Sequence, residues 1–425
     1  MNEKNTTLEP STHAATKQSQ AKSLACRFCG SDTFVVIDLG DLPFANALVK
    51  DLSEAVETYP TALHVCSHCS TAQLSFCADQ NILYRDYVYI TPESPMLSEH
   101  YQKIVEYLMG KKYFDSSANV LEVGSNIGRF LKHLKPYVKS VVGVDPARNI
   151  AKMAEEQGVP TISEFFNAET AREIAAKRGK MDLVVARHCF AHNEMPWLML
   201  EGVAELLAPE GVFVVENAYF PDTVEKREFD QIYHEHMYYY NLRAIRQLMQ
   251  KYGFKLIDGY HSPIHGGTML YIVKRADAQG DLTEAAKNFL EQEKDMHKES
   301  FYAPFINDIE RNKQQLREII GKVKAEGKTV YAYGASAKST TLLNYFGLDH
   351  TLIPYIVDST ITKHGKYIPL ANIKVMSEEE AQQNYPDYYL LTIWNYKDEI
   401  IRKVRASGNL KSKFIIPHPK VEIVD

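Results

Sequence analysis

Four consecutive residues combine a phenol, two imidazoles and a carboxylate: Tyr233, His234, Glu235 and His236. These are proton-transfer groups, because a histidine with an ordinary pKa of about 6.5 can act as an acid or a base at neutral pH. In a strand, alternation would place Tyr233 and Glu235 on one side and both histidines on the other. An irregular turn can instead bring three of these side chains toward one atom, so we expect a turn.

A glycine-containing turn lies upstream of this run. Residues 118–124 form a short apolar strand that leads into Gly124-Ser125-Asn126-Ile127-Gly128, and a helical pattern follows from Arg129. A second strand over 140–145 ends in Asp145, which can accept hydrogen bonds from ribose hydroxyls. The turn lacks the middle glycine of G-x-G-x-x-G, which disfavours NAD. These segments predict the first βαβ unit of a doubly wound sheet.

Two more apolar segments, 181–186 and 211–216, predict further strands of the same sheet. Their carboxyl ends lie at the edge where open α/β sheets bind ligands. His188 and His192 come just after the first of these strands, so both are candidates for that edge.

Four of the six cysteines form two C-x-x-C pairs, Cys26 with Cys29 and Cys66 with Cys69. Two such pairs supply four thiolates in the tetrahedral arrangement of a structural zinc site. Six cysteines are too few for a disulfide scaffold in a chain of this length, so a reducing compartment is expected. We therefore expect Zn(II) on these four residues, where it stabilises the fold.

Residues 328–341 predict another strand, followed by a turn of small residues and the start of a helix. A charged helical segment is predicted before them, over 283–324. Further strands at 351–358, 388–394 and 413–417 indicate a second Rossmann-like unit. The start of its helix suits an anion such as a phosphate, although the turn is not a Walker A motif. The candidate anion contacts there are Ser336, Lys338 and Ser339.

Composition narrows the functional classes. The chain has 425 residues, which predicts two or three domains, and a formal net charge of −6, which gives no footprint for nucleic acid. Its apolar runs are shorter than the roughly 20 residues of a membrane span. Residues 1–24 are polar and predict a disordered tail. A cytoplasmic protein is expected.

The order of these features resembles the nucleotide-sugar C-methyltransferases, which methylate C-3 of dTDP-4-keto-6-deoxy sugars. A four-cysteine module, the turn from Gly124 to Gly128, the Y-x-E-H run, His265-Gly-Gly-Thr268 and the Tyr-Gly-Ala-Ser-Ala-Lys segment ending at Lys338 carry the resemblance. It implies an α/β fold with a class I S-adenosylmethionine methyltransferase core. It also implies a zinc-binding and substrate-contacting module over 25–95, a methyltransferase domain over 96–305 and a C-terminal Rossmann-like domain over 306–425.

The resemblance also implies roles for individual residues. The implied catalytic residues are Tyr233, Glu235, His236, His192 and Tyr87, with Tyr84 and Tyr89 as alternatives to Tyr87, and His188 as the alternative to His192. The implied S-adenosylmethionine contacts are Glu122, Gly124, Ser125, Asn126, Gly128, Asp145, Phe166 and Asn167, with Phe165 as the alternative ring against adenine. The implied substrate contacts are His265, Gly266, Ser336, Lys338 and Ser339.

In the implied reaction the C-3 proton is removed next to the C-4 ketone, and the resulting enolate takes a methyl group. We expect His236 to be the base, with Glu235 or a tyrosine orienting either His236 or the substrate. His192 and Tyr233 are the expected donors to the enolate oxygen, where one donor contributes about 3 kcal/mol. The alternatives are an O- or N-methyltransferase on a nucleotide sugar and a zinc-dependent binding adaptor. The expected partner is a dTDP-sugar or other nucleotide sugar, and a monomer is expected.

Overall fold

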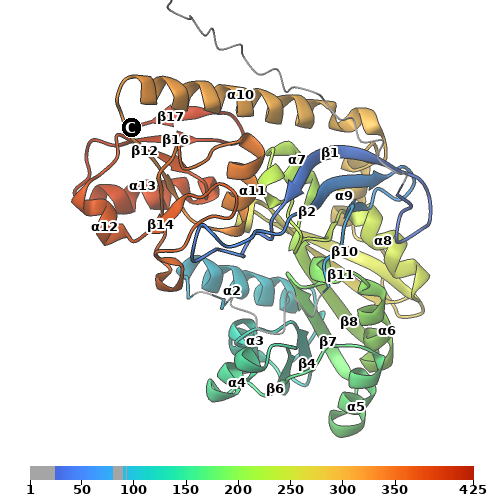
Figure 1. The fold of residues 1–425 in the computed structure, drawn as a ribbon. Coiled ribbons are helices and arrows are strands. Elements are labelled where there is room, and N and C mark those ends of the chain that lie inside the picture. Colours follow the sequence, from blue (N-terminus) through green and yellow to red (C-terminus); the bar gives the residue numbers. More distant parts are fainter. Residues whose placement is uncertain (1–23, 80–89, 92) are drawn as a thin grey trace, which may run out of the picture.

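The computed structural model describes residues 24–79, 90–91 and 93–425, and the strands of these residues form three sheets (Figure 1). The tail expected over 1–24, apart from Leu24, lies outside the described residues. Tyr84, Tyr87 and Tyr89 lie outside them as well, so their expected role stays a prediction. Among the helices of the described residues, none combines the length and the apolar composition needed to cross a membrane.

The first sheet has four antiparallel strands in the order β1-β2-β3-β9. Its strands are β1 (Thr33–Leu42), β2 (Tyr59–Cys66), β3 (Ala72–Leu74) and β9 (Tyr238–Tyr239). The first three come from the cysteine-containing module, whereas β9 follows the Y-H-E-H run by one residue. Tyr239 pairs with Ala72 and Tyr238 with Gln73. The candidate catalytic run is therefore attached directly to the N-terminal module.

The second sheet has seven strands in the order β10-β11-β8-β7-β4-β5-β6. Its strands are β4 (Asn119–Val123), β5 (Ser140–Val144), β6 (Thr161–Ile162), β7 (Met181–Arg187), β8 (Leu207–Ala218), β10 (Phe254–Ser262) and β11 (Thr268–Arg275). Strands β4 to β8 run parallel to one another. Strand β11 is antiparallel to both β8 and β10. This is the class I methyltransferase arrangement, with its ligand edge at the carboxyl ends of β4, β5, β7 and β8.

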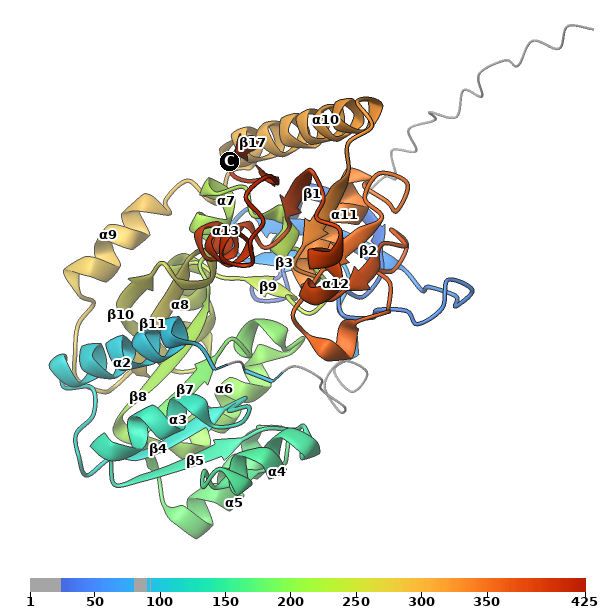
Figure 2. The same cartoon turned by 90° about the vertical axis from the view of Figure 1, so that its left-hand side faces the viewer.

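Helices cover this sheet, as Figures 1 and 2 show. They are α2 (Pro95–Gly110), α3 (Arg129–Leu134), α4 (Arg148–Glu156), α5 (Ala168–Arg178), α6 (Pro196–Leu206), α8 (Leu242–Lys251) and α9 (Glu284–Gln292). Helix α7 (Phe220–Glu225) instead packs in the core that the first and third sheets share. Short 3-10 turns, η1 (Lys135–Tyr137), η2 (Phe190–His192), η3 (Phe229–Gln231) and η4 (Ile264–Gly266), lie between these helices. In α2, Pro95 takes the first turn, where its missing N–H costs nothing, and Leu97, Tyr101, Ile104 and Leu108 form the buried face.

The third sheet has six strands in the order β14-β13-β12-β15-β16-β17. Its strands are β12 (Val330–Tyr333), β13 (Tyr355–Val357), β14 (Lys374–Met376), β15 (Tyr388–Leu391), β16 (Lys413–Ile416) and β17 (Glu422–Val424), and all pairs except β16–β17 are parallel. Its helices are α10 (Ala303–Ala325), α11 (Ala337–Phe346), α12 (Glu378–Gln383) and α13 (Lys397–Ala406). Three further 3-10 turns are η5 (Glu299–Tyr302), η6 (Ile361–Lys363) and η7 (Trp394–Tyr396). The strand, turn and helix predicted over 328–341 are β12, the Gly334 turn and the first part of α11.

The charged segment expected as one long helix is two helices, α9 and α10, separated by irregular turns over 293–302. Glu293 lies at the break, where its buried carboxylate accepts hydrogen bonds from the backbone N–H groups of Leu242 and Arg243 and from the Tyr219 hydroxyl. These contacts with the first turn of α8 and with Tyr219 lie where α9 ends. Helix α10 then runs along the third sheet (Figures 1 and 2).

One hydrophobic core joins the N-terminal and C-terminal modules. Val36, Leu63 and Leu74 of the first sheet pack in the same cluster as Ile309 of α10 and Ile356 of the third sheet. The two modules at the ends of the chain therefore support each other, and both face the candidate ligand edge of the second sheet.

Candidate functional site

The Y-H-E-H run forms a turn, as expected, because the His236 backbone N–H donates to the Tyr233 carbonyl at 2.9 Å. The His236 ring is held at both nitrogens. Its Nδ1 lies 2.9 Å from the Gln231 carbonyl and must donate, since a carbonyl can only accept. Its Nε2 then accepts from the Tyr233 hydroxyl at 3.0 Å. Burial lowers the pKa of His236 to about 4, so the ring is neutral at neutral pH.

The other two residues of the run face the N-terminal module. Glu235 accepts a hydrogen bond from the Asn46 side chain at 2.6 Å, and burial raises its pKa. His234 lies 2.9 Å from the Thr61 hydroxyl, and its ring packs among Phe44, Tyr59 and Phe76. Of the two orienting residues expected, a tyrosine contacts His236: the Tyr233 hydroxyl and the Gln231 carbonyl hold the ring, whereas Glu235 bonds to Asn46.

Three more histidines, His188, His192 and His265, lie near the hydrogen-bonded pair Tyr233 and His236. The rings of His192 and His236 have their centroids 5.0 Å apart, and those of His188 and His265 are 5.4 Å apart. Burial lowers the pKa of His192 well below its usual value, and lowers that of His265 to about 3. His265 Nδ1 lies 3.2 Å from the Tyr396 hydroxyl of the C-terminal module. The structure thus brings four histidines from three separate segments to one edge of the second sheet.

A buried ionic cluster lies under the histidines. Glu216 at the end of β8 is fully buried, and its carboxylate accepts from Arg187 Nε and from His100 Nε2, each at 2.5 Å. The Arg187 guanidinium packs over the rings of Tyr101 and Phe130, at 4.4 and 4.7 Å from their centroids. Arg187 and the neighbouring histidines keep the pKa of Glu216 well below its usual value despite burial, so it is ionised.

The turn between β4 and α3 has the backbone that the cofactor loop requires. Gly124 has φ +65°, and a Cβ there would meet Cys189 Cβ at 2.7 Å. Gly128 has φ +73°, and a Cβ there would meet Val159 at 2.8 Å. At the end of β5, the Asp145 carboxylate accepts from the backbone N–H groups of Asn126 (2.9 Å) and Ala147 (3.0 Å). These contacts hold the loop against the strand end.

Two polar groups beside this loop fit an S-adenosylmethionine site. Glu122 Oε2 and the Ser125 hydroxyl are buried without a hydrogen-bond partner among the described residues. Burial raises the pKa of Glu122 to about 8. Orphaned acceptors and donors of this kind are expected where a polar ligand completes the site.

The aromatic pair expected near adenine is divided between core and surface. Phe166 is 7% exposed and packs in the core, whereas Phe165 is 37% exposed. The Asn167 side chain caps α5 by accepting from the Thr170 backbone N–H. Exposure therefore favours Phe165 over Phe166 as the ring that meets adenine, and the adenine contact itself stays a prediction.

The C-terminal module contributes Lys338, at the start of α11. Its ammonium nitrogen is buried without a hydrogen-bond partner among the described residues and lies 3.9 Å from Glu228 Oε2. Ser339 has a different role from the one expected, because its fully buried hydroxyl donates to the Gly334 carbonyl. Ser336 lies in the same turn, with its hydroxyl 3.1 Å from that of Ser339. Of the three residues expected to contact an anion, Lys338 is the one whose side-chain donor makes no hydrogen bond within the described residues.

His265 and Gly266 lie in η4, the turn between β10 and β11, and their backbone is held tightly. His265 has φ +57°, and Gly266 has φ +95°. The Lys226 ammonium donates to the Gly266 carbonyl and to Asp222 Oδ2. A Cβ on Gly266 would meet Glu228 Oε1 at 2.3 Å, so only glycine fits beside this carboxylate.

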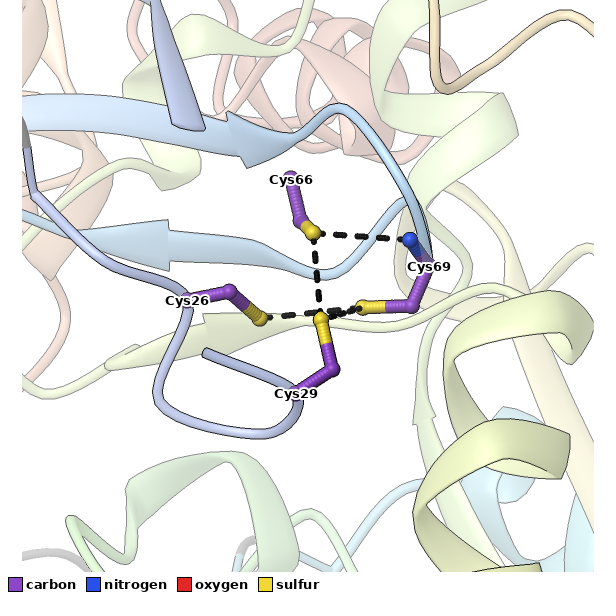
Figure 3. Close-up of side chains that lie close together, drawn as sticks. All are labelled: Cys26, Cys29, Cys66 and Cys69. Atoms are coloured by element: carbon purple, nitrogen blue, oxygen red, sulfur yellow. Dashed lines mark hydrogen bonds between the residues drawn. The ribbon is translucent and has the colours of Figure 1, made fainter. Parts of the chain in front are cut away.

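Four cysteine sulfurs lie together as expected (Figure 3). The sulfur atoms of Cys29 and Cys66 are 3.4 Å apart, and those of Cys26 and Cys69 are 3.6 Å apart. Tetrahedral Zn(II) with Zn–S bonds of about 2.3 Å requires sulfur separations of about 3.8 Å. The donor set, its spacing and its burial therefore fit a closed structural zinc site.

Several groups of the site have weak or absent sequence signals. Glu216 stands at a predicted strand end, so its position indicated a place at the ligand edge. His100, Lys226 and Glu228 belong to segments without a recognisable motif, and only their packing brings them to the site.

Comparisons with known proteins cover nearly all of the chain. A family model described as the C-terminal domain of C-methyltransferases matches residues 263–419. Models described as a methyltransferase domain and as a zinc-binding domain match residues 96–258 and 26–84.

Individual proteins also match. The C-methyltransferase NovU of Streptomyces niveus is 35% identical over 404 residues, which cover 94% of this chain and 96% of that protein. The uncharacterised methyltransferase YcgJ of Bacillus subtilis is 25% identical over 114 residues, which cover 26% of this chain and 44% of that protein. The solved structure of the N-methyltransferase NodS from Bradyrhizobium japonicum WM9 has a TM-score of 0.34 and 13% identity, covering 44% of this chain and 99% of that chain.

Proposed function

Since the chain belongs to the C-methyltransferase family and is an S-adenosylmethionine-dependent methyltransferase, we propose that its acceptor is C-3 of a nucleotide-linked 4-keto-6-deoxy sugar. The dTDP sugar is the expected form. The observation that supports this proposal is the hydrogen-bonded Tyr233–His236 pair beside His192, at the carboxyl edge of the second sheet. Carbon methylation next to a ketone needs such a base, whereas a hydroxyl or amine acceptor brings its own lone pair.

The hydrogen bonds of His236 define how the base works. Because Nδ1–H is held by the Gln231 carbonyl, Nε2 is the nitrogen that can receive a proton. Tyr233 presents its hydroxyl to that nitrogen, so its oxygen accepts the C-3 proton as its own proton moves to Nε2. The electron pair of the C-3–H bond is left as an enolate, and His192 is placed as a donor to its oxygen.

When bound, S-adenosylmethionine would supply an electrophilic methyl group on its sulfonium sulfur. Glu122, Ser125 and the glycine loop would hold it at the strand ends. Lys338 would supply a positive charge for the substrate diphosphate, in line with its ammonium nitrogen, which makes no hydrogen bond within the described residues. We propose that the protein acts as a monomer.

Two other functions predict different observations. An O- or N-methyltransferase acting on a nucleotide sugar would need no C-4 ketone and would not exchange the C-3 proton with solvent. A zinc-dependent binding adaptor would not transfer a methyl group, and the family relationship disfavours it.

The test is an assay of the purified protein with S-adenosylmethionine and a panel of dTDP-4-keto-6-deoxyhexoses in deuterated water, read by mass spectrometry. We expect one substrate to gain a methyl group and to exchange its C-3 proton for deuterium. Methylation without a ketone requirement would instead support O- or N-methylation. The absence of both methylation and exchange across the panel would contradict the proposed substrate class.

A first variant for this assay is His236→Asn. The asparagine amide keeps a donor near the Gln231 carbonyl but removes the acceptor of the Tyr233 proton. We expect methyl transfer and C-3 exchange to fall by about 100-fold or more, with S-adenosylmethionine binding unchanged in calorimetry. Unchanged turnover would exclude His236 as the base.

A further inference from the structure

We propose that His188, oriented by Glu216, is a further catalytic residue that donates a hydrogen bond to the substrate oxygen on which negative charge develops. This inference rests on the proposed function, because an enolate oxygen is the group it would stabilise. It assigns to His188 a role beside that of His192, so that two imidazoles of the same loop flank the oxygen.

The backbone of His188 is held in an unusual conformation. His188 directly follows β7 and has φ +50°, a left-handed conformation that residues with a Cβ adopt at a cost. Its N–H donates to the Glu216 carbonyl of the neighbouring strand at 2.7 Å, which fixes this conformation. The strain serves to direct the side chain at the ligand edge, since a continued strand would place it on one face of the sheet.

The ring of His188 lies against a carboxylate and an open space. Its Nε2 is 3.6 Å from Glu216 Oε1, and the side chain is still 35% exposed. The ring also meets the His265 ring edge to face at 5.4 Å. Glu216 Oε1 therefore lies on the Nε2 side of the ring, although Nε2 makes no hydrogen bond within the described residues. The opposite side of the ring, which carries Nδ1, is the side left for a ligand.

Glu216 provides a fixed negative charge. Arg187 Nε and His100 Nε2 each donate to it at 2.5 Å, and the His100 Nδ1 lies 3.2 Å from the Ser262 hydroxyl. Arg187 itself packs over the rings of Tyr101 and Phe130. A carboxylate held in this way can orient a neighbouring imidazole ring.

Burial dominates at the other three histidines of the site. It lowers the pKa of His236 to about 4 and that of His265 to about 3, and lowers that of His192 well below its usual value. These rings remain neutral at neutral pH. His188 differs from them in its position, because its Nε2 lies beside the Glu216 carboxylate and its side chain is 35% exposed.

The proposed chemical step follows from this position. As the C-3 proton passes to Tyr233 and His236, negative charge moves onto the C-4 oxygen, and His188 donates from Nδ1–H to that oxygen. When the carbon has taken the methyl group, the carbonyl forms again and His188 keeps its proton. The released proton on the Tyr233–His236 pair passes to solvent, so the protons balance.

The experiment compares His188→Gln with His350→Gln, a substitution of an exposed histidine in the C-terminal module. We expect His188→Gln to lower both C-3 deuterium exchange and methyl transfer by about 100-fold or more, with S-adenosylmethionine affinity within about twofold. His350→Gln should behave as the unchanged protein. Wild-type exchange in His188→Gln would overturn the proposal, whether or not methyl transfer is lost, because the enolate would then form without this donor.

If His188→Gln loses S-adenosylmethionine binding, His188→Asn is measured, which keeps a shorter polar side chain. Loss of cofactor binding there too makes His188 structural and overturns the proposal. An unchanged protein that neither exchanges nor methylates any sugar of the panel contradicts the proposed substrate class instead, so the two failures are distinguishable.

Glu216 is tested as a positioning residue by comparing Glu216→Gln with Glu216→Asp, which keeps the carboxylate. We expect Glu216→Gln to lower C-3 deuterium exchange while S-adenosylmethionine affinity is kept, and Glu216→Asp to restore part of the exchange. Equal loss of exchange in both variants, together with a lower unfolding temperature, would show that Glu216 only supports the fold.

Discussion

Tyr233 and His236 share one hydrogen bond, and each residue limits what the other can do. The imidazole Nε2 accepts from the phenol, so neither atom is free to act alone. Burial that keeps His236 neutral also removes competing water, which strengthens the remaining polar contacts. In the proposed reaction the pair therefore acts as one proton-accepting unit, with the tyrosine as the part that meets the substrate.

Tyr233→Phe is the sharpest test of this unit, because it removes one oxygen and leaves the ring packing against His236 in place. We expect the methyl-transfer rate to fall by about 100-fold, since the C-3 proton loses its first acceptor. C-3 deuterium exchange should fall in parallel, while S-adenosylmethionine binding is kept. A Tyr233→Phe variant with full exchange would show that His236 receives the proton directly.

The turn between β4 and α3 shows how two elements create a binding loop. Gly124 leaves β4 with φ +65° and packs against Cys189, which lies just beyond β7. The loop can therefore pass close to the end of a neighbouring parallel strand. S-adenosylmethionine has no phosphates, so its loop does not need the middle glycine that lets a dinucleotide-binding loop approach a pyrophosphate. Asn126 can therefore occupy that position here.

Gly124→Val should lower S-adenosylmethionine affinity by about 100-fold or more, because a Cβ would lie 2.7 Å from Cys189 Cβ and φ +65° is strained for valine. Isothermal calorimetry measures the affinity. Gly321→Ala is the matched control, since Gly321 lies within α10 with nothing within 4 Å of a new Cβ. This control should bind the cofactor normally and gain a little stability. Normal binding by Gly124→Val would contradict the loop assignment.

Strand β9 connects distant parts of the whole protein. It joins the catalytic turn to β3, and β3 is joined to the cysteines through the turn that contains Cys66 and Cys69. The N-terminal module also meets the turn through the Asn46–Glu235 hydrogen bond. A metal site some distance from the reacting atoms can thus determine how precisely the catalytic turn is placed.

Removal of zinc should therefore reduce activity through structure. We expect Cys66→Ser to lose bound zinc and to unfold at a lower temperature, with methyl transfer reduced more than cofactor affinity. Zinc content by atomic spectroscopy, thermal unfolding and calorimetry measure the three effects. Cys77→Ser, outside the four-cysteine cluster, is the control and should keep its zinc. A zinc-free protein with unchanged stability and rate would contradict this role.

Local patterns were sufficient to predict many of the elements. Strands β4, β5, β7 and β8 are apolar runs because parallel strands are buried on both faces, and that pattern is visible without a structure. The two C-x-x-C pairs and the turn at Tyr233–His236 depend on residues a few positions apart, and the structure confirms both. The break between α9 and α10 was missed because its cause, the contacts of Glu293, lies in another element.

The order of residues in the sequence does not determine which partner each polar side chain contacts. Glu235 bonds to Asn46, 189 positions away, and Glu216 bonds to His100, 116 positions away. Ser339, next to an apparent anion site, turns inward to cap its own helix. The sequence sets which groups exist and on which elements they stand, because spacing along a strand or helix is regular. Which of these groups meet depends on how the three sheets pack, since a hydrogen bond needs two atoms within about 3 Å and no local pattern encodes that separation.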